Sequence, residues 1–215
     1  DILREFVNLK CRLMPYLYRN AIETAKTGVP MMRSMVLEFT EDRNCAYLAS
    51  QYMLGDSLLV APIFNEDGIA EYYLPGGRWT SLLSGDVKEG GRWYKEKHGY
   101  LSIPLYVRAG SIVAMGARDD NAVYDYADGT TFRVYALDDG CEAQTTVYDT
   151  ENREAVKAAV THCGSRYEIQ VSGGTEVKVA LMHAGMPKTV SCAYEMDGDH
   201  AVIAVPKEGN VTVEF

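Results

Sequence analysis

The chain has 215 residues, of which 47% are hydrophobic and 24% charged, and its formal net charge at pH 7 is −9. This apolar content is enough for one or two buried cores, so a wholly disordered chain is excluded. The excess of acidic residues, 30 against 21 basic ones, argues against nucleic acid as a partner because it repels phosphates. No apolar stretch approaches the ~20 residues of a membrane helix, so no membrane partner is expected.

The five cysteines are odd in number and widely spaced, and no Cys-x-x-Cys pair occurs. They predict free thiols in a cytoplasmic protein, rather than a disulfide framework or a zinc site. Length sets a further limit, because a complete (β/α)8 barrel needs ~250 residues. A barrel enzyme could therefore be only partly present in this chain.

The charge is divided unevenly along the chain. Residues 1–116 contain 13 basic and 13 acidic residues, whereas residues 117–215 contain 8 basic and 17 acidic ones. The change falls beside the polar stretch ARDDN at 117–121. A composition shift of this kind predicts a domain boundary at residue 117.

Residues 1–27 carry apolar side chains at three- and four-residue spacing, which predicts a helix with one buried face. Pro15 is expected to kink or divide this helix, because a proline inside a helix removes a backbone hydrogen bond. Gly28 followed by Pro30 is expected to end it. A chain that opens inside an amphipathic helix indicates a piece of a larger protein.

The next segments predict an α/β arrangement. The apolar run MMRSMVLEF at 31–39 has no Gly or Pro, which favours a buried strand. A second helix is expected over residues 44–54, closed by Gly55. Helix, buried strand and helix in this order are typical of an α/β layer, such as the last unit of a barrel.

From Gly55 onward, short β segments alternate with turns rich in Gly, Asp and Pro. After residue 117, apolar and polar residues alternate between turn signals every ~8–12 residues, which predicts an antiparallel sandwich. The fold class is therefore mainly β, with two antiparallel β-sandwich modules at 55–116 and 117–215 after an α/β segment at 1–54. The strands expected before residue 117 are 57–64, 70–74, 78–83, 105–107 and 111–115.

No motif in the sequence predicts a catalytic residue, a metal or a cofactor. The run DDG at 138–140 is typical of a hairpin turn in which Asp bonds its own backbone. The run DGD at 197–199 lacks the EF-hand spacing, so calcium is not expected there. The four histidines are dispersed without an HExxH pair, and the nucleophile motif G-x-S-x-G is absent.

Aromatic residues gather around a Gly-rich excursion at 84–91. Trp79 and Trp93 flank it, and exposed indole faces stack well on sugars, so a carbohydrate-binding surface is one interpretation. The other, which we favour, is that both side chains fill the edge of a sandwich core.

Several runs in a fixed order are more specific than any one of them. They are LKCRLMPYLYR at 9–19, GVPMMR at 28–33, LEF at 37–39, QYMLGDSLLVAP at 51–62, YLPGGRWT at 73–80 and VRAGSI at 107–112. This series resembles the C-terminal part of glycoside hydrolase family 31, most closely its bacterial α-xylosidase and α-glucosidase branch. The resemblance is strong before residue 117 and weaker beyond it.

The resemblance implies a retaining α-glycosidase that hydrolyses terminal α-xylosyl or α-glucosyl residues with two aspartates, one as nucleophile and one as acid and base. Family members carry both on earlier barrel strands, and no position here matches either motif. Residues 1–54 would end the barrel, with 31–39 as its eighth strand, and residues 55–116 and 117–215 would be the proximal and distal C-terminal sandwiches. The fragment itself would be structural and inactive, with the upstream barrel and N-terminal domains of the same enzyme as its partners.

Arg33 and Glu38 lie on the expected last barrel strand and are the only candidates near an active site. An internal ion pair that steadies the barrel end is expected there, rather than contact with substrate. Without barrel neighbours the first helix would expose apolar residues such as Phe6, Met14 and Leu17, which favours homo-oligomers. The alternatives to an enzyme fragment are a carbohydrate-binding module and an oligomerisation module.

Overall fold

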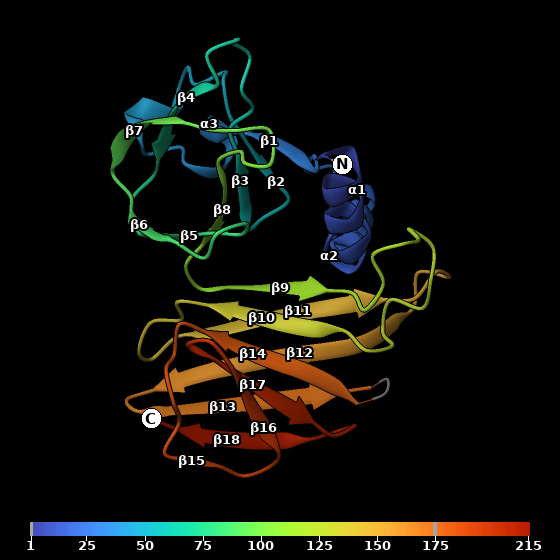
Figure 1. Ribbon diagram of the computed structural model, residues 1–215. Helices are drawn as coiled ribbons and strands as arrows, with labels where there is room; N and C mark the ends of the chain where they lie inside the picture. Colours follow the sequence, from blue (N-terminus) through green and yellow to red (C-terminus); the bar gives the residue numbers. More distant parts are fainter. Residues whose placement is uncertain (1, 174–175) are drawn as a thin grey trace. The chain divides into compact units, whose positions relative to one another are not determined.

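The computed structural model describes residues 2–173 and 176–215 and divides the chain into two compact units (Figure 1). The proximal unit comprises residues 23–109, and the distal unit comprises residues 3–22 with 110–215. Both units are built mainly from antiparallel strands, as the sequence predicts.

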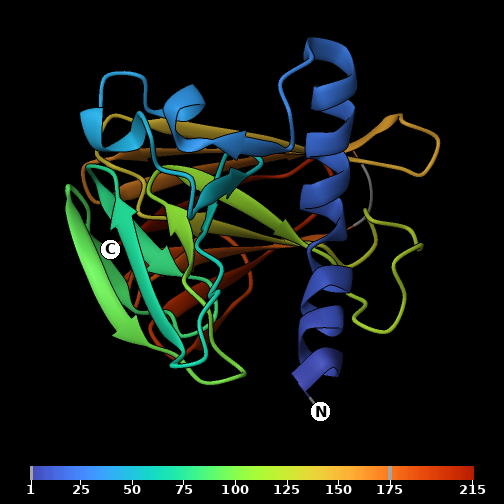
Figure 2. The same ribbon diagram turned by 90° about the horizontal axis from the view of Figure 1, so that it is seen from above.

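Two helices open the chain, α1 (Ile2–Arg12) and α2 (Met14–Thr27), and Figure 2 shows them following one another along the chain. The predicted division near Pro15 is confirmed, because the helix is interrupted one residue before α2 and Pro15 lies in its first turn, where no amide donor is needed. Gly28 then takes a φ of +77° and donates to the Thr24 carbonyl at 2.9 Å, so the predicted helix end is also confirmed. In the described part of the chain, no helix has the length and apolar character needed to cross a membrane.

The α/β arrangement predicted for residues 31–54 is wrong. The run at 31–39 forms a three-residue strand, β1 (Met32–Ser34), followed by a helical turn, α3 (Met35–Glu38). Strand β1 pairs antiparallel with β2 (Tyr52–Leu54) at the end of a sheet, and Met32 is exposed. The described residues therefore contain no barrel unit.

The helix predicted over residues 44–54 is replaced by a 3-10 turn, η1 (Arg43–Cys45), and an extended segment. Side-chain bonds to the backbone explain the difference. Asp42 accepts from the Asn44 amide at 3.0 Å, and the buried Gln51 side chain exchanges two hydrogen bonds with the Tyr73 backbone, at 2.7 and 2.8 Å. The Asp42 side chain caps the short turn, and the Gln51 side chain is held on the Tyr73 backbone, so side-chain bonds compete here with a continued helix.

The proximal unit contains a six-stranded sheet and a separate two-stranded ribbon. The sheet has the order β1-β2-β3-β8-β5-β6, and the ribbon pairs β4 with β7. The β segments predicted between residues 57 and 109 are confirmed in part, while β6 lies within the Gly-rich excursion at 84–91 and β7 directly after it, where no strand is predicted. The remaining bounds are β3 (Leu58–Val60), β4 (Ile69–Leu74), β5 (Arg78–Ser81), β6 (Val87–Glu89), β7 (Arg92–Lys97) and β8 (Leu105–Arg108).

The distal unit is a sandwich of two five-stranded sheets that enclose one apolar core (Figure 1). The predicted alternation is confirmed, although β10 and β14 run parallel within an otherwise antiparallel sheet. One sheet is β16 (Tyr194–Asp197), β17 (His200–Val205), β14 (Val177–Met182), β10 (Thr131–Tyr135) and β9 (Ser111–Met115). The other is β11 (Glu142–Tyr148), β12 (Glu154–Cys163), β13 (Arg166–Ser172), β18 (Asn210–Glu214) and β15 (Thr189–Val190).

The distal unit begins earlier than the charge distribution suggests. Strand β9 pairs along its length with β10, and all five of its residues are buried, so the compact unit starts at Gly110 rather than at residue 117. Strand pairing and burial set this limit, whereas charged residues report only which surfaces face water.

The first helix belongs to the distal unit, and its apolar face is partly covered there. The Gly116 amide donates to the Arg12 carbonyl at 2.7 Å, and Met14 packs against the distal core. Phe6 and Leu17 are likewise half-buried, so the predicted exposure of these three side chains is wrong. The apolar residues of α1 that do face solvent are Ile2, Leu3 and Val7.

The two tryptophans differ sharply in burial, which gives a direct stability test. Trp79 is 1% exposed and its Nε1 donates to the Pro75 carbonyl at 2.7 Å, whereas Trp93 is 48% exposed. We expect Trp79→Ala to lower the unfolding free energy of the proximal unit by ~3–5 kcal/mol, because it opens a cavity and leaves a carbonyl unpaired. Trp93→Ala should cost less than ~1 kcal/mol. Calorimetric unfolding of both variants measures this, and equal losses would contradict the assigned core.

Candidate functional site

The candidate site lies on the β4–β7 ribbon, whose two faces differ in character. Strand side chains point alternately to opposite faces, so paired residues share a face. Tyr73 pairs with Trp93 and Glu71 with Lys95 on one face, which we call the outer face. The opposite, inner face carries Tyr72 paired with Tyr94, and Glu96.

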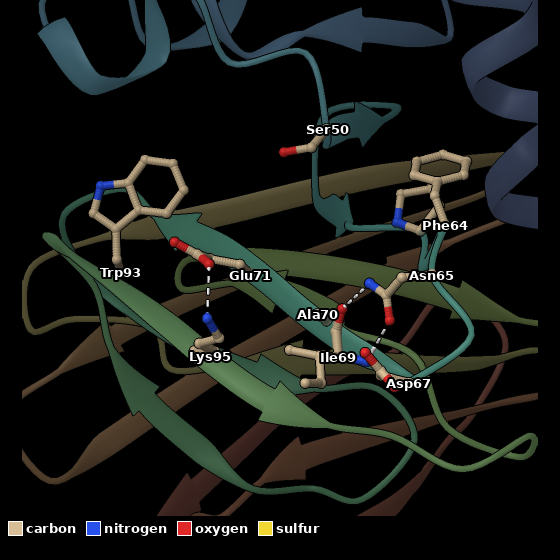
Figure 3. A pocket seen from close by; sticks show the side chains of 10 residues that line it. Ser50, Phe64, Asn65, Asp67, Ile69, Ala70, Glu71, Trp93 and Lys95 are labelled. Carbon is tan, nitrogen blue, oxygen red and sulfur yellow. Dashed lines mark hydrogen bonds and ion pairs between the residues drawn. The ribbon is translucent and has the colours of Figure 1, made fainter.

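A pocket of about 550 Å³ opens over the outer face (Figure 3). Trp93 and Phe64 lie at opposite ends of it, and Glu71 and Lys95 form its floor between them. The volume falls within the ~300–1,000 Å³ of small-molecule sites. The residues that line it are Ser50, Pro62, Phe64, Asn65, Asp67, Ile69, Ala70, Glu71, Trp93 and Lys95.

Trp93 offers this pocket a flat apolar surface. Its ring lies 5.6 Å from the buried Tyr73 ring and keeps 48% of its surface exposed. Glu71 and Lys95 form an ion pair of 3.4 Å beside it, with both side chains more than half exposed. An aromatic face next to charged donors and acceptors can stack on a sugar ring and bond its hydroxyls.

Trp79 takes no part in this surface. It belongs to the proximal core, together with Leu74 and Tyr106, and its indole nitrogen is already bonded to the Pro75 carbonyl. Of the two tryptophans that the sequence singles out, only Trp93 is therefore placed to touch a ligand. The favoured interpretation, that both fill the core, is right for Trp79 and wrong for Trp93.

The inner face of the ribbon carries a polar cluster that the sequence analysis missed. The Tyr72 hydroxyl donates to Glu96 Oε2 at 2.6 Å, accepts from Lys88 Nζ at 3.0 Å, and lies 3.0 Å from the Tyr106 hydroxyl. Lys88 is also ion-paired with Glu96. Its ammonium lies 4.7 to 5.7 Å from the ring centres of Tyr72, Tyr94 and Tyr106, within range for cation–π attraction.

The cluster shifts the acidity of its members in opposite directions. Burial raises the pKa of Tyr72, and its bond to the Glu96 carboxylate raises the pKa further. Burial alone would raise the pKa of Glu96 too, but the hydrogen bonds from Lys88 and Tyr72 outweigh it and hold that pKa below its usual value. Burial lowers the pKa of His98, whose Nε2 lies 3.9 Å from Glu96. The carboxylate and the ammonium thus stay charged, and the phenol stays neutral.

Arg33 and Glu38 form the ion pair that the sequence suggests. Arg33 Nη1 donates to Glu38 Oε1 at 2.5 Å, and both side chains are mostly buried. The sequence analysis missed a third member, Arg108, which donates to Glu38 Oε2 and to the Asp56 carbonyl, both at 3.1 Å. Glu38 is enclosed by two guanidinium groups, an arrangement that holds a chain segment in place rather than one that presents a reactive carboxylate.

The histidines are less dispersed than the sequence suggests. His183 and His200 lie together in the distal unit, with ring centres 4.8 Å apart and Asp199 between them. A turn is present at residues 138–140, where the Cys141 amide donates to the Asp138 carbonyl at 3.1 Å, but the predicted hairpin is wrong. The turn joins β10 to β11, which belong to different sheets.

Two family models match consecutive parts of this chain. The model described as glycosyl hydrolase family 31 C-terminal domain covers residues 28–113, within which the ribbon and its pocket lie. The model described as alpha-xylosidase YicI, C-terminal domain, covers residues 125–215. The chain belongs to glycoside hydrolase family 31.

Relatives in family 31 place the chain at a position within longer enzymes. It is 38% identical over 184 residues to the alpha-xylosidase XylQ of Lactiplantibacillus pentosus, and 37% identical over 189 residues to an alpha-xylosidase of Emericella nidulans. Each alignment covers 84% of this chain but only 24% of the relative. The chain thus spans about a quarter of the length of these family 31 relatives.

Solved family 31 structures share the fold. A Flavobacterium johnsoniae GH31 dextranase complexed with glucose matches all of this chain and 32% of its own with a TM-score of 0.87, at 22% identity. The GH31 alpha-xylosidase of Xanthomonas citri matches 97% of this chain and 24% of its own with a TM-score of 0.70, at 24% identity. Identities this low support the arrangement of strands and say nothing about ligands.

The inner cluster predicts a pH dependence of stability. Because the folded-state pKa of Glu96 is depressed, its stabilising contribution is full above about pH 4.5 and is lost as the pH falls through the folded-state value. At pH 7, Glu96→Gln should cost about 1–2 kcal/mol, less than breaking a fully buried pair, since its side chain is 36% exposed. Urea unfolding between pH 7 and 3 should show this cost shrinking on acidification.

The matched control is Glu71→Gln on the outer face of the same ribbon. Its partner Lys95 and Glu71 itself are 67% and 61% exposed, so this change should cost less than ~0.5 kcal/mol. A constant difference between wild type and Glu96→Gln across the pH range would contradict the assigned electrostatics.

Proposed function

We propose that this chain is the C-terminal region of a retaining α-glycosidase that hydrolyses terminal α-xylosyl or α-glucosyl residues. The observation that carries the proposal is the pair of consecutive family 31 matches, at residues 28–113 and 125–215. The names of similar proteins support the substrate class, since they include alpha-xylosidases and alpha-glucosidases of bacteria, fungi and archaea. The cytoplasmic location expected from the cysteines stays a prediction.

Within that enzyme, we assign the chain a structural role. Retaining hydrolysis needs two carboxyl groups ~5–5.5 Å apart, one on each side of the scissile bond. The buried carboxylate Glu38 is instead enclosed by Arg33 and Arg108, and the pocket carboxylate Glu71 is paired with Lys95. Catalysis is therefore assigned to the rest of the enzyme.

The Arg33–Glu38–Arg108 cluster is the element we propose for that structural role. It ties the segment after α2 to β8, because Arg108 bonds both Glu38 and the Asp56 carbonyl. Arg108 also lies 5.5 Å from the centre of the Phe39 ring. A segment fixed at three points presents a rigid surface to the upstream domains.

The division of labour predicts that the chain alone gives no turnover. With 4-nitrophenyl α-xyloside or α-glucoside as substrate, the chain should release no nitrophenol above background. An enzyme that carries it as the C-terminal region should release it and form the α-anomer first, as seen by proton NMR. Hydrolysis by the chain alone would refute the structural assignment, and a first product with the β-anomeric configuration would refute retention.

A second function, carbohydrate binding at the outer pocket, is favoured by the exposure of Trp93. The pocket has the volume for a small saccharide, and its floor supplies the Glu71 carboxylate and the Lys95 ammonium. Asn65 contributes little, because its amide is bonded to the Ile69 backbone at 2.6 and 2.9 Å. Stacking on Trp93 would carry the affinity. Homo-oligomerisation stays a separate prediction.

Binding at Trp93 predicts weak affinity that depends on the indole. Calorimetric titration with xylo- or gluco-oligosaccharides should give a millimolar Kd that Trp93→Ala weakens by ~10-fold, the loss expected from one stacked ring. Tyr47→Ala is the matched control, since Tyr47 is 98% exposed and does not line the pocket. Equal affinities in all three proteins, or no binding at all, would exclude this function.

A further inference from the structure

A second cluster of chemically able side chains lies in the distal unit, away from the ribbon. Strands β14 and β17 pair antiparallel, with Leu181 opposite Ala201, and lie side by side in Figure 1. Continuing this register brings His183, just after β14, opposite Asp199, just before β17. His200 opens β17 itself. The topology thus brings together three ligand-type residues from two places in the sequence.

The three side chains face one another closely. His183 Nδ1 lies 2.7 Å from Asp199 Oδ2, and His200 Nδ1 lies 2.8 Å from Asp199 Oδ1. Each oxygen of one carboxylate therefore faces one imidazole nitrogen. A set of three donor atoms, one from each residue, lies within 4.8 Å of one another, and the cluster is open to solvent on the His183 and Asp199 side.

One atom of the cluster makes two short contacts that cannot both be hydrogen bonds. The His183 backbone amide donates to His200 Nδ1 at 3.1 Å, which requires a lone pair on that nitrogen. The same nitrogen faces Asp199 Oδ1, which also carries lone pairs. A neutral imidazole nitrogen is either donor or acceptor, so a nitrogen that accepts from the amide faces the carboxylate oxygen lone pair to lone pair, and a cation bound beside the two atoms would remove this repulsion.

We propose that His183, Asp199 and His200 bind a divalent transition-metal ion of the Zn²⁺ class. Two imidazole nitrogens and one carboxylate oxygen are a donor set that Zn²⁺ accepts, with bonds of ~2.0–2.2 Å. Ligands on one such ion lie ~2.9–3.4 Å apart, so the two short contacts of 2.7 and 2.8 Å need to open by a few tenths of an ångström, while the 4.8 Å span of the three donor atoms needs to close by about 1.5 Å through side-chain rotation. The exposed His183 amide would then bond water. Hard cations such as Mg²⁺ prefer oxygen ligands and are not expected here.

The ion would link the end of β14 to the turn between β16 and β17. Both segments lie at the same end of the paired strands β14 and β17, where the Gly185 amide also donates to the Asp199 carbonyl at 2.9 Å. A ligand that binds only the folded state raises the unfolding temperature in proportion to its concentration and affinity. The ion would therefore stabilise the folded distal unit by linking these two segments.

The test is a calorimetric titration of the chain with Zn²⁺, and with Mg²⁺ for comparison. We expect one Zn²⁺ per chain and no response to Mg²⁺. Affinity for Zn²⁺ should fall at least ~10-fold in both His183→Asn and His200→Ala, because each removes one of three ligands. Asparagine suits position 183, where φ is +56°, because it tolerates the left-handed region.

Asp197→Asn is the matched control, since this carboxylate lies in the same turn but outside the cluster, and it should leave Zn²⁺ affinity unchanged. Thermal unfolding without metal checks that each variant folds, and added Zn²⁺ should raise the Tm of wild type and of Asp197→Asn only. Equal Zn²⁺ uptake by wild type and both histidine variants would overturn the proposal, because the ion would then lie elsewhere, for example on the exposed Cys141 or Cys163. Absence of binding to wild type would overturn it as well.

Discussion

The alternation of side chains along the β4–β7 ribbon is the constraint on which the candidate site depends. Tyr72 and Glu96 must share the inner face, where Lys88 reaches both, and this places Trp93 on the outer face. A slip of one residue would turn Trp93 inward and move the Glu96 carboxylate to the other face. The inner cluster therefore fixes the register that keeps the indole exposed.

The inner cluster contributes more to the specificity of the ribbon's arrangement than to the stability of the fold. Removing a carboxylate and an ammonium from water costs free energy that their attraction only partly offsets. Here the Tyr72 hydroxyl bonds both charged groups, and three tyrosine rings lie near the Lys88 ammonium, so few polar atoms are left unpaired when the ribbon is docked. Any other docking of the ribbon would separate these partners. We infer that the cluster selects one arrangement of the ribbon.

The sequence predicts the distal fold better than the proximal one, and the reason is physical. Strands such as β13 and β17 bury every second residue, so their periodicity is visible in the chain. The run at 31–39 has no such signal, because a short apolar segment suits a strand or a helix equally, and its pairing with β2 decides the outcome. The segment at 44–54 depends on a local cap from Asp42 to the Asn44 amide and on the bonds from Gln51 to the distant Tyr73 backbone, and no local pattern reveals the latter.

The candidate sites, like the proximal fold, depend on contacts between distant residues that the local sequence does not predict. Arg33 and Glu38 are close in sequence, so their ion pair could be anticipated, but Arg108 joins them from β8, across the sheet. Trp79 and Trp93 lie in similar local sequences, so the sequence does not distinguish them. Strand pairing places Trp79 in the core and leaves Trp93 exposed to solvent.

The acidic excess of the distal unit takes on a different meaning once its contacts are known. Its 17 acidic against 8 basic residues after position 116 first indicate a solvated module with little functional character. A negative surface also raises the local concentration of cations of every kind, by an amount that depends on charge and not on chemistry. Selection among those cations requires donor atoms of particular softness. In the described residues, the imidazoles of His183 and His200 beside Asp199 are such donors. The negative charge would thus attract cations to the unit, and the imidazole ligands would select which cation binds.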